Sequence, residues 1–306
     1  MFLITHIILV SIKIFNGGLQ MKTKKTAIIY AVLAAALYAL NAPISKLLLA
    51  QIPSTMMAGL LYLGAGLGMF FMEKLKKNKE ELPLTKKELP YTIAMVVLDI
   101  AAPILLMIGL TKCSAANASL LNNFEIVATS LIALFIFKET INKRLWFAII
   151  FVTFSSILLS FEDMSSLTFS WGSLFVLFAC MCWGLENNCT RMLSSKNPAQ
   201  IVIIKGFGSG LGSLLLSLIL GERFIGIGYI FLALVLGFVA YGLSIYFYIY
   251  AQRDLGAAKT STYYAISPFI GAILSLIIFS EQPSMIFIIA LIIMAVGTYL
   301  SSTSDN

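Results

Sequence analysis

The chain has 306 residues, of which 59% are hydrophobic and 11% are charged, and its formal net charge is +7. Soluble domains carry about 25% charged residues. This composition therefore excludes an ordinary soluble protein, because so few charges would not cover its surface with polar groups. It predicts a membrane protein.

The distribution of charge and of metal-binding residue types excludes two further classes. The basic residues form short clusters between apolar runs, which is typical of cytoplasmic loops, so we expect no nucleic-acid partner. The only histidine is His6, and the cysteines form no CxxC pair, so no metal site, cofactor or redox centre is expected. We expect the cysteines to pack between helices as small residues. They are Cys113, Cys180, Cys182 and Cys189.

Residues 1–21 are predicted to be an N-terminal extension of the fold. They contain a short apolar run interrupted by Lys13, and a membrane span needs about 20 apolar residues. The segment also lacks the basic start and the small-residue cleavage site of a signal peptide. The Lys-rich stretch that begins at Met21 resembles a natural start, so residues 1–21 are interpreted as a start-site artefact or a surface helix.

Ten apolar runs follow that are long enough to cross a bilayer, and each must be helical so that its backbone groups are satisfied within the segment. The first five cover residues 27–50, 55–72, 90–110, 116–137 and 143–161, and the second five cover 170–191, 199–220, 225–250, 257–279 and 283–301. Prolines lie inside three of the runs, where each removes a helical hydrogen bond and is expected to kink the helix. They are Pro43, Pro103 and Pro268.

The alternation of charge along the chain predicts the orientation of these spans. With ten spans and a cytoplasmic N-terminus, most basic residues fall in cytoplasmic segments, and the outer loops hold only Lys112 and Arg223. This bias agrees with the positive-inside rule. We therefore expect a multi-pass protein of a bacterial inner membrane with both termini in the cytoplasm.

The two groups of five spans resemble each other. Tyr38-Ala39-Leu40-Asn41 in the first span corresponds to Trp183-Gly184-Leu185-Glu186 in the sixth, and alternate glycines recur in the second and seventh spans. Because five is odd, the second copy must cross the membrane in the opposite orientation. The predicted fold is an all-α membrane protein of ten transmembrane helices, built as two inverted repeats at residues 22–161 and 170–302. Inverted repeats are typical of transporters with a site near the membrane midplane.

These repeated motifs, ending at Lys46 and Arg191, resemble the opening helix of each half in the EamA family of the drug/metabolite transporter superfamily. Phe137-Lys138-Glu139 and Phe279-Ser280-Glu281 resemble the acidic residue that follows the family's fourth helix. The resemblance covers about residues 22–302. It implies a ten-helix secondary transporter whose cavity is lined by spans 1, 3, 4, 6, 8 and 9, with spans 5 and 10 peripheral and available for a homodimer contact. Asn41, Glu125 and Glu186 make the helix interiors more polar than is usual in the family.

Charged and polar residues inside the runs are the candidate substrate pathway, because a charge in the membrane interior costs about 2.5–3.5 kcal/mol and tends to face a cavity. The candidate residues are Tyr38, Asn41, Lys46, Asp99, Ser119, Asn122, Glu125, Thr129, Trp183, Glu186, Asn187, Arg191, Lys205, Ser261, Tyr264 and Ser267.

Two helical stripes among these candidates are expected to face each other across a polar cavity. At 100° per residue, one stripe of the fourth span carries Ser119, Asn122, Glu125 and Thr129, and the equivalent stripe of the ninth span carries Ser261, Tyr264, Ser267 and Gly271. A carboxylate in such a cavity can bind and release a proton, so Glu125 or Asp99 is a candidate proton carrier. The alternative is that each carboxylate forms a static pair with Lys46 or Lys205.

The sixth span allows two interpretations. Glu186 and Arg191 could bind the amine and the carboxylate of a zwitterion, or Arg191 lies at the cytoplasmic end while Glu186 belongs to a packing network. The partner of Lys205 is either Glu186 or Asp99, and Lys46 is expected near the outer mouth.

Glycines and tyrosines in the seventh and eighth spans are also ambiguous. The glycines from Gly206 to Gly212 lack the lysine and hydroxyl of a phosphate loop and indicate close helix packing instead. The tyrosines suit either interface anchoring or cavity lining. They are Tyr241, Tyr246, Tyr248 and Tyr250.

The sequence favours a secondary transporter of a small metabolite, such as an amino acid or a related polar compound, with export as the expected direction. The expected partners are this substrate, the lipid bilayer, and protons as a coupling ion. An intramembrane enzyme is disfavoured because the one histidine lies in the extension, and no catalytic residue is assigned. A non-transporting scaffold or sensor is the alternative, but it would have no need of charges at mid-depth.

Overall fold

The computed structural model of the chain describes residues 24–75, 82–138, 140–163, 168–193, 196–223, 226–255, 260 and 263–303. These residues are almost entirely helical. The extension 1–21, the acidic residue Glu139 and the candidate Ser261 lie outside the described residues.

The predicted spans of the first half are helical in the structure. The helices are α2 (Lys24–Ala39), α3 (Asn41–Leu48), α4 (Ser54–Leu75), α5 (Leu89–Lys112), α6 (Ala115–Leu121), α7 (Phe124–Phe135) and α8 (Lys143–Leu159), with a 3₁₀ turn η1 (Lys86–Glu88) before α5. The second half contains α9 (Trp171–Arg191), α10 (Pro198–Ile219), α11 (Ile227–Gly237), the π-helical segment η2 (Phe238–Leu243), α12 (Ser244–Leu255), α14 (Ser267–Phe279) and α15 (Met285–Ser302).

A short antiparallel hairpin that the sequence analysis did not predict joins the two halves. Its strands are β1 (Phe161–Asp163) and β2 (Thr168–Phe169). The strands are too short to show a periodic pattern of side chains, so the sequence carried no usable signal for them.

Seven helical segments of the described chain are long and apolar enough to cross a membrane. The other three predicted spans correspond to α8, α9 and α14. Helices α8 and α14 are shorter than the seven, with 17 and 13 residues. Helix α9 is long enough, but polar and charged residues such as Glu186 and Arg191 make it less apolar.

Three of the spans are interrupted near their middle. Helix α2 gives way to α3 at Leu40, where Pro43 cannot donate a hydrogen bond to the carbonyl of Ala39. Helix α14 likewise begins just before Pro268. Between α6 and α7, tighter backbone bonds that span three residues surround Asn122 and Asn123, whose side chains can compete for backbone groups.

Pro103 has a different effect from the other two prolines. Helix α5 continues without interruption from Leu89 to Lys112 across it.

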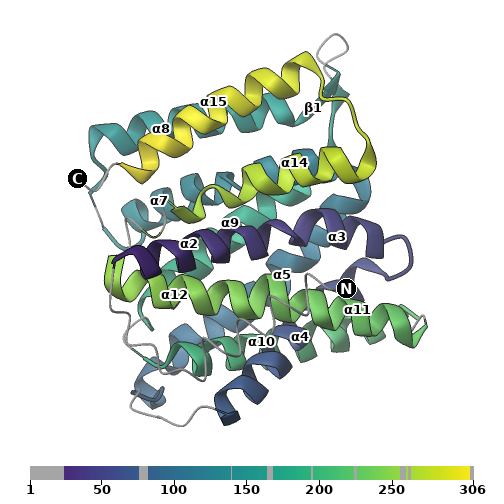
Figure 1. Cartoon of the computed structure of the whole chain (residues 1–306), viewed down its shortest axis with the longest axis vertical. Helices are drawn as coiled ribbons and strands as arrows, with labels where there is room; N and C mark the ends of the chain where they lie inside the picture. Colours follow the sequence, from purple (N-terminus) through teal and green to yellow (C-terminus); the bar gives the residue numbers. More distant parts are fainter. Residues whose placement is uncertain are drawn as a thin grey trace.

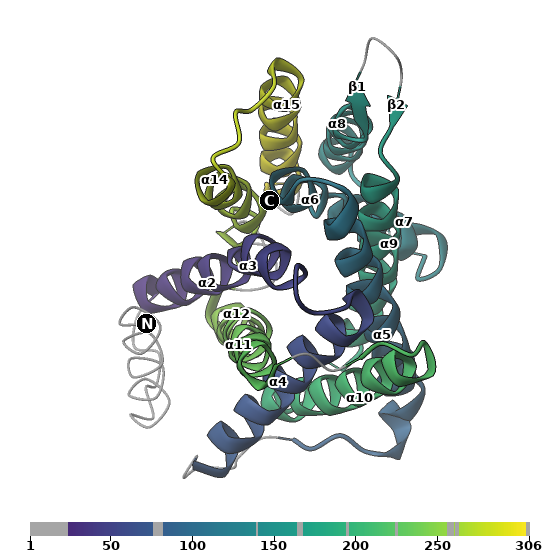
Figure 2. The same cartoon turned by 90° about the vertical axis from the view of Figure 1, so that its right-hand side faces the viewer.

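Equivalent helices of the two halves pack against each other. Helix α4 contacts α10, α6 contacts α14, and α8 contacts α15. Helices α8 and α15 lie side by side at one end of the long axis, and α4 and α10 lie at the other end (Figures 1 and 2). The position of α8 and α15 at this edge agrees with the peripheral position that the family resemblance implies for spans 5 and 10.

Two of these pairs, α4–α10 and α8–α15, run antiparallel. Gly59 of α4 faces Leu214 of α10, whereas Gly66, further along α4, faces Gly206, which comes earlier in α10. At the other edge, Ser155 of α8 donates a hydrogen bond to the carbonyl of Ala290 at 2.6 Å, and Arg144 donates to that of Thr303.

Glycine residues permit the close approach of α4 to α10. A Cβ atom at Gly206 would lie 2.3 Å from the Cα of Gly66 and 2.8 Å from the carbonyl oxygen of Tyr62. Neither backbone can move aside without separating the helices. The predicted packing role of these glycines is therefore confirmed.

The outward faces of the helices are apolar. Phe147, Ile150 and Phe154 on α8 are exposed, as are Leu215 on α10 and Ile292 on α15. Exposed side chains of this size and number suit contact with lipid.

We predict that Gly206→Ala destabilises the protein by about 1–3 kcal/mol, because the added methyl group overlaps the backbone of α4. Thermal unfolding in detergent measures the effect. The control is Gly228→Ala on α11, where no atom lies within 4 Å of the added Cβ. Equal unfolding temperatures for the two variants would contradict the packing argument.

Candidate functional site

A buried cluster of charges lies where α5, α9 and α10 meet. The ammonium group of Lys205 lies 2.8 Å from an oxygen of Glu186 and 3.3 Å from Oδ2 of Asp99. The hydroxyl of Tyr62 on α4 donates to Oδ1 of Asp99 at 2.7 Å, and Thr190 donates to Glu186. Asp99 is fully buried, and Glu186 is almost so. The sequence analysis left the partner of Lys205 open between the two carboxylates, and Lys205 pairs with both.

A second polar cluster joins α7 to α9 around Glu125. The amide of Asn187 donates to an oxygen of Glu125 at 2.5 Å and lies 3.4 Å from the hydroxyl of Thr129. The neighbouring Asn188 donates to the backbone carbonyls of Thr129 and Gly184. Glu125 pairs with neither Lys46 nor Lys205 within ion-pair distance in the described chain, so the alternative of static pairing applies to Asp99 and not to Glu125.

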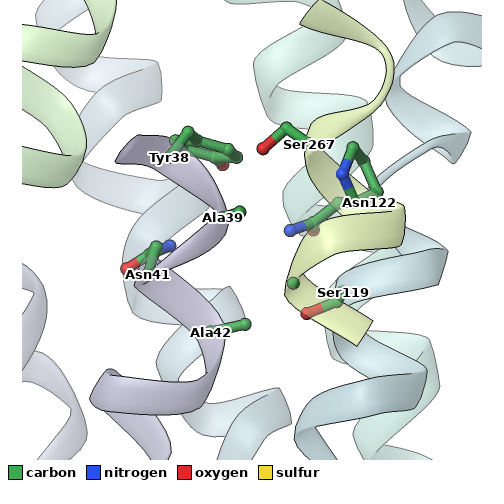
Figure 3. Close-up of a pocket in the computed structure, with 9 residues that line it drawn as sticks. Tyr38, Ala39, Asn41, Ala42, Ser119, Asn122 and Ser267 are labelled. Atoms are coloured by element: carbon green, nitrogen blue, oxygen red, sulfur yellow. The ribbon is translucent and has the colours of Figure 1, made fainter. Parts of the chain in front are cut away.

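A small pocket lies at the interruptions of the three broken spans (Figure 3). It is nearly closed, with a volume of about 10 Å³, which is about the space of one water molecule. Its lining comes from the α2–α3 junction, the end of α6 and the start of α14, and consists of Tyr38, Ala39, Asn41, Ala42, Ser119, Asn122, Ser267, Pro268 and Gly271. The structure thus brings together residues of the two stripes that the helical periodicity placed opposite each other.

Close contact between α6 and α14 shapes this pocket. A Cβ atom at Gly271 would lie 2.9 Å from the hydroxyl oxygen of Ser119 and 3.2 Å from the carbonyl of Ala39. The hydroxyls of Ser119 and Ser267 are buried without a hydrogen-bond partner, and in Figure 3 both point across the pocket toward the α2–α3 segment. Buried hydroxyl groups usually have a partner, so these two groups are available to a ligand.

Aromatic rings surround one side of the pocket. The ring of Tyr38 lies 5.8 Å from that of Tyr241 and 5.9 Å from that of Tyr264. Asn41 donates to the hydroxyl of Tyr241 at 2.9 Å and accepts from Ser45 at 3.0 Å. Tyr241 belongs to the π-helical segment η2, and such segments occur frequently at functional sites. Tyr241 is buried and contacts Tyr38 and Asn41, two residues of the pocket lining.

Three candidates lie away from these clusters. Lys46 donates to the carbonyls of Leu110 and Cys113 at the end of α5, Trp183 packs in the apolar core, and Arg191 is exposed at the end of α9. Glu186 therefore faces Lys205 in the interior, whereas Arg191 is exposed.

Two residues of the site were not among the candidates of the sequence analysis. Tyr62 lies in a glycine-rich apolar run, and Tyr241 was one of several tyrosines with an ambiguous role. The available signal was their depth, because tyrosines in membrane helices concentrate at the interfaces and these two lie mid-span. Their hydrogen bonds to Asp99 and Asn41 depend on packing between helices far apart in sequence.

The fold and the site together define a multi-pass membrane protein with a polar interior. Buried ionisable groups of this kind, in helices broken at mid-depth, are typical of transporters.

Comparison with known proteins identifies the family. The model of the EamA-like transporter family matches the chain twice, over residues 25–161 and 170–303. The chain therefore belongs to the EamA-like transporter family, and it is a membrane transporter and not an enzyme. The two matches also confirm the internal repeat that the sequence indicated.

Individual relatives agree with this assignment. An uncharacterized transporter of Methanothermobacter thermautotrophicus is 25% identical over 283 residues, which cover 86% of this chain and 82% of the relative. The uncharacterized transporter YyaM of Bacillus subtilis is 22% identical over 216 residues, or 68% of this chain and 70% of YyaM. A protein of known crystal structure has the same fold, with a TM-score of 0.66 and 16% identity over 91% of this chain and 96% of that chain.

We predict that Lys205→Met lowers the stability by about 3–5 kcal/mol, because it leaves two buried carboxylates without their cation. Adding Asp99→Asn and Glu186→Gln to the same chain should restore most of the loss by removing the unpaired charges. Thermal unfolding in detergent compares the single and triple variants. A triple variant less stable than Lys205→Met would show that the charges are not the cause.

Proposed function

We propose that the protein is a secondary active transporter of a small polar metabolite, such as an amino acid or a related compound, which binds in the pocket between the broken helices. The observation that carries this proposal is that the interruptions of three spans meet at one pocket. Broken helices present backbone groups that a substrate or ion can bind at mid-depth. Alternating access moves the substrate across the membrane, with export as the expected direction.

The arrangement of the helices supports a fold of ten transmembrane helices in two inverted repeats, residues 22–161 and 170–302. Equivalent helices pack together, and the pairs α4–α10 and α8–α15 run antiparallel. This is the relation expected when one five-helix unit enters the membrane upside down relative to the other. Such halves can rock against each other around a fixed central site.

The same arrangement supports a multi-pass protein with both termini in the cytoplasm, and the membrane that we propose for it is a bacterial inner membrane. The start of α2 and the end of α15 lie on the same side of the molecule (Figure 1), as an even number of crossings requires. The excess of lysine and arginine in the segments on that side favours the cytoplasm. The outer face of α8 and α15 is available for a homodimer contact.

The buried cluster of Lys205, Asp99 and Glu186, called here the Lys205 cluster, suits a proton as the coupling ion. One ammonium group serves the carboxylates of Asp99 and Glu186, so the cluster carries one net negative charge when both are ionised. The other titratable groups near it among the described residues are Tyr62, Tyr241, Glu125 and Cys189. Uptake of one proton neutralises the cluster, and release of that proton accompanies the conformational change of alternating access.

Transport is tested with purified protein in liposomes, by measuring both uptake and efflux of radiolabelled amino acids, polyamines and nucleosides. We expect flux of at least one class, and we expect Ser119→Leu to abolish it because the larger side chain fills the pocket against Gly271. Ile277→Phe, which adds volume on an exposed face of α14, is the control. Full flux with Ser119→Leu would contradict the pocket as the substrate site.

Proton coupling is tested with Asp99→Asn. This variant leaves Lys205 and Glu186 as a neutral pair, so a pH gradient should no longer drive flux. Exchange of labelled for unlabelled substrate should persist, because exchange needs no net proton movement. Glu281→Gln, which lies after α14, is the control. A pH-driven flux equal to that of the unaltered protein would remove the Lys205 cluster from coupling.

A further inference from the structure

The interior of the described chain holds more negative than positive charge. Asp99, Glu125 and Glu186 contribute three carboxylates, and Lys205 contributes one ammonium group that is already shared by two of them. Lys46 cannot compensate, because its ammonium group is bound to the carbonyls of Leu110 and Cys113. An uncompensated charge in a membrane interior is costly, so the site calls for a further cation.

Glu125 is the carboxylate that this cation would meet. Within the part of the chain that the structure describes, its only hydrogen-bond donor is the neutral amide of Asn187. Lys205 acts on it electrostatically, but from beyond ion-pair distance. A carboxylate has four lone-pair sites, so Glu125 keeps acceptor capacity for a ligand.

Glu125 lies one turn beyond Asn122, which lines the pocket, and it is close enough to interact electrostatically with Tyr38, Tyr241 and Tyr264. Aromatic faces attract ammonium groups, and the attraction grows when the pair is removed from water. The carboxylate and the rings therefore favour the same kind of ligand.

The hydroxyls of Ser119 and Ser267 supply an independent observation. Both are buried, lack a partner and point into the pocket. Such groups suit a polar, uncharged end of a ligand. Among the residues that the structure describes, no basic side chain lines the pocket, so a carboxylate on the ligand would meet no described cation there.

We propose that the transported substrate is a small amine without a carboxylate, whose ammonium group binds Glu125 and whose polar end reaches Ser119 and Ser267. This inference rests on the proposed transport function and narrows its substrate class from small polar metabolites to amines, which excludes amino acids. In this state the pocket has a volume of about 10 Å³, about the space of one water molecule, so the amine enters only when the two halves move apart.

The test uses four-carbon probes that differ at one end. 4-Amino-1-butanol carries an ammonium group, 1,4-butanediol a hydroxyl and 4-hydroxybutyrate a carboxylate, while each keeps a hydroxyl at the other end. Binding to the purified protein is measured by calorimetry in detergent. We expect 4-amino-1-butanol to bind at least about tenfold more tightly than the other two, since loss of a buried charge pair commonly costs more than this.

Glu125→Gln should reduce this preference to less than about twofold, and the control Glu281→Gln should leave it unchanged. The probe series on the unaltered protein keeps the inference falsifiable even if Glu125→Gln fails to fold. Equal binding of the three probes, no binding of any of them, or a preference for the carboxylate would overturn the amine assignment. The liposome screen decides transport separately, so flux of an anionic or neutral compound would refute the amine and leave the transporter function standing.

Discussion

The interior of this protein depends on one ammonium group, that of Lys205, which is shared by carboxylates from two other helices. Water is absent from the bilayer core, so a buried charge is stable only where its partners are in place. The partners are placed by backbone packing. Gly206, next to Lys205, lies against Gly66 of α4, and Tyr62, one turn earlier on α4, donates to Asp99. The close contact between α4 and α10 therefore lies directly beside the charge cluster.

The second constraint comes from the backbone. Three spans are broken at the depth of the pocket, and a fourth carries the π-helical segment η2 there. Each departure from regular helix leaves backbone groups without their usual partners, which is tolerated in a membrane only where protein or a polar cavity replaces lipid. These helix interruptions meet at the pocket, where the unpaired hydroxyls of Ser119 and Ser267 also lie. This concentration explains how a transporter of the EamA-like family can offer polar contacts in a chain that is mostly apolar.

The interior charges divide into two kinds of environment. Asp99 and Glu186 are enclosed with Lys205, whereas Glu125 has only a neutral amide and nearby tyrosine rings. The enclosed cluster has two carboxylates for one ammonium group, and this excess negative charge suits a proton. A carboxylate beside a pocket suits an organic cation. In the proposed mechanism the coupling ion and the substrate bind different carboxylates, and both sites contact helix α9, through Glu186 and Asn187.

Much of the fold followed from the sequence alone, because the bilayer restricts a chain to apolar helices of a known length. Hydropathy located the apolar helices, the glycine spacing indicated close helix packing, and the recurrence of motifs indicated the repeat. Helical periodicity also brought Ser119, Asn122 and Ser267 to one cavity. Only the tertiary structure decided that Lys205 pairs with both Asp99 and Glu186, and that Glu125 has no basic partner within ion-pair distance in the described chain. It also placed Tyr62 and Tyr241 at the site and bound Lys46 to the end of α5. These outcomes depend on distances between helices far apart in sequence, and a one-dimensional pattern does not contain such distances.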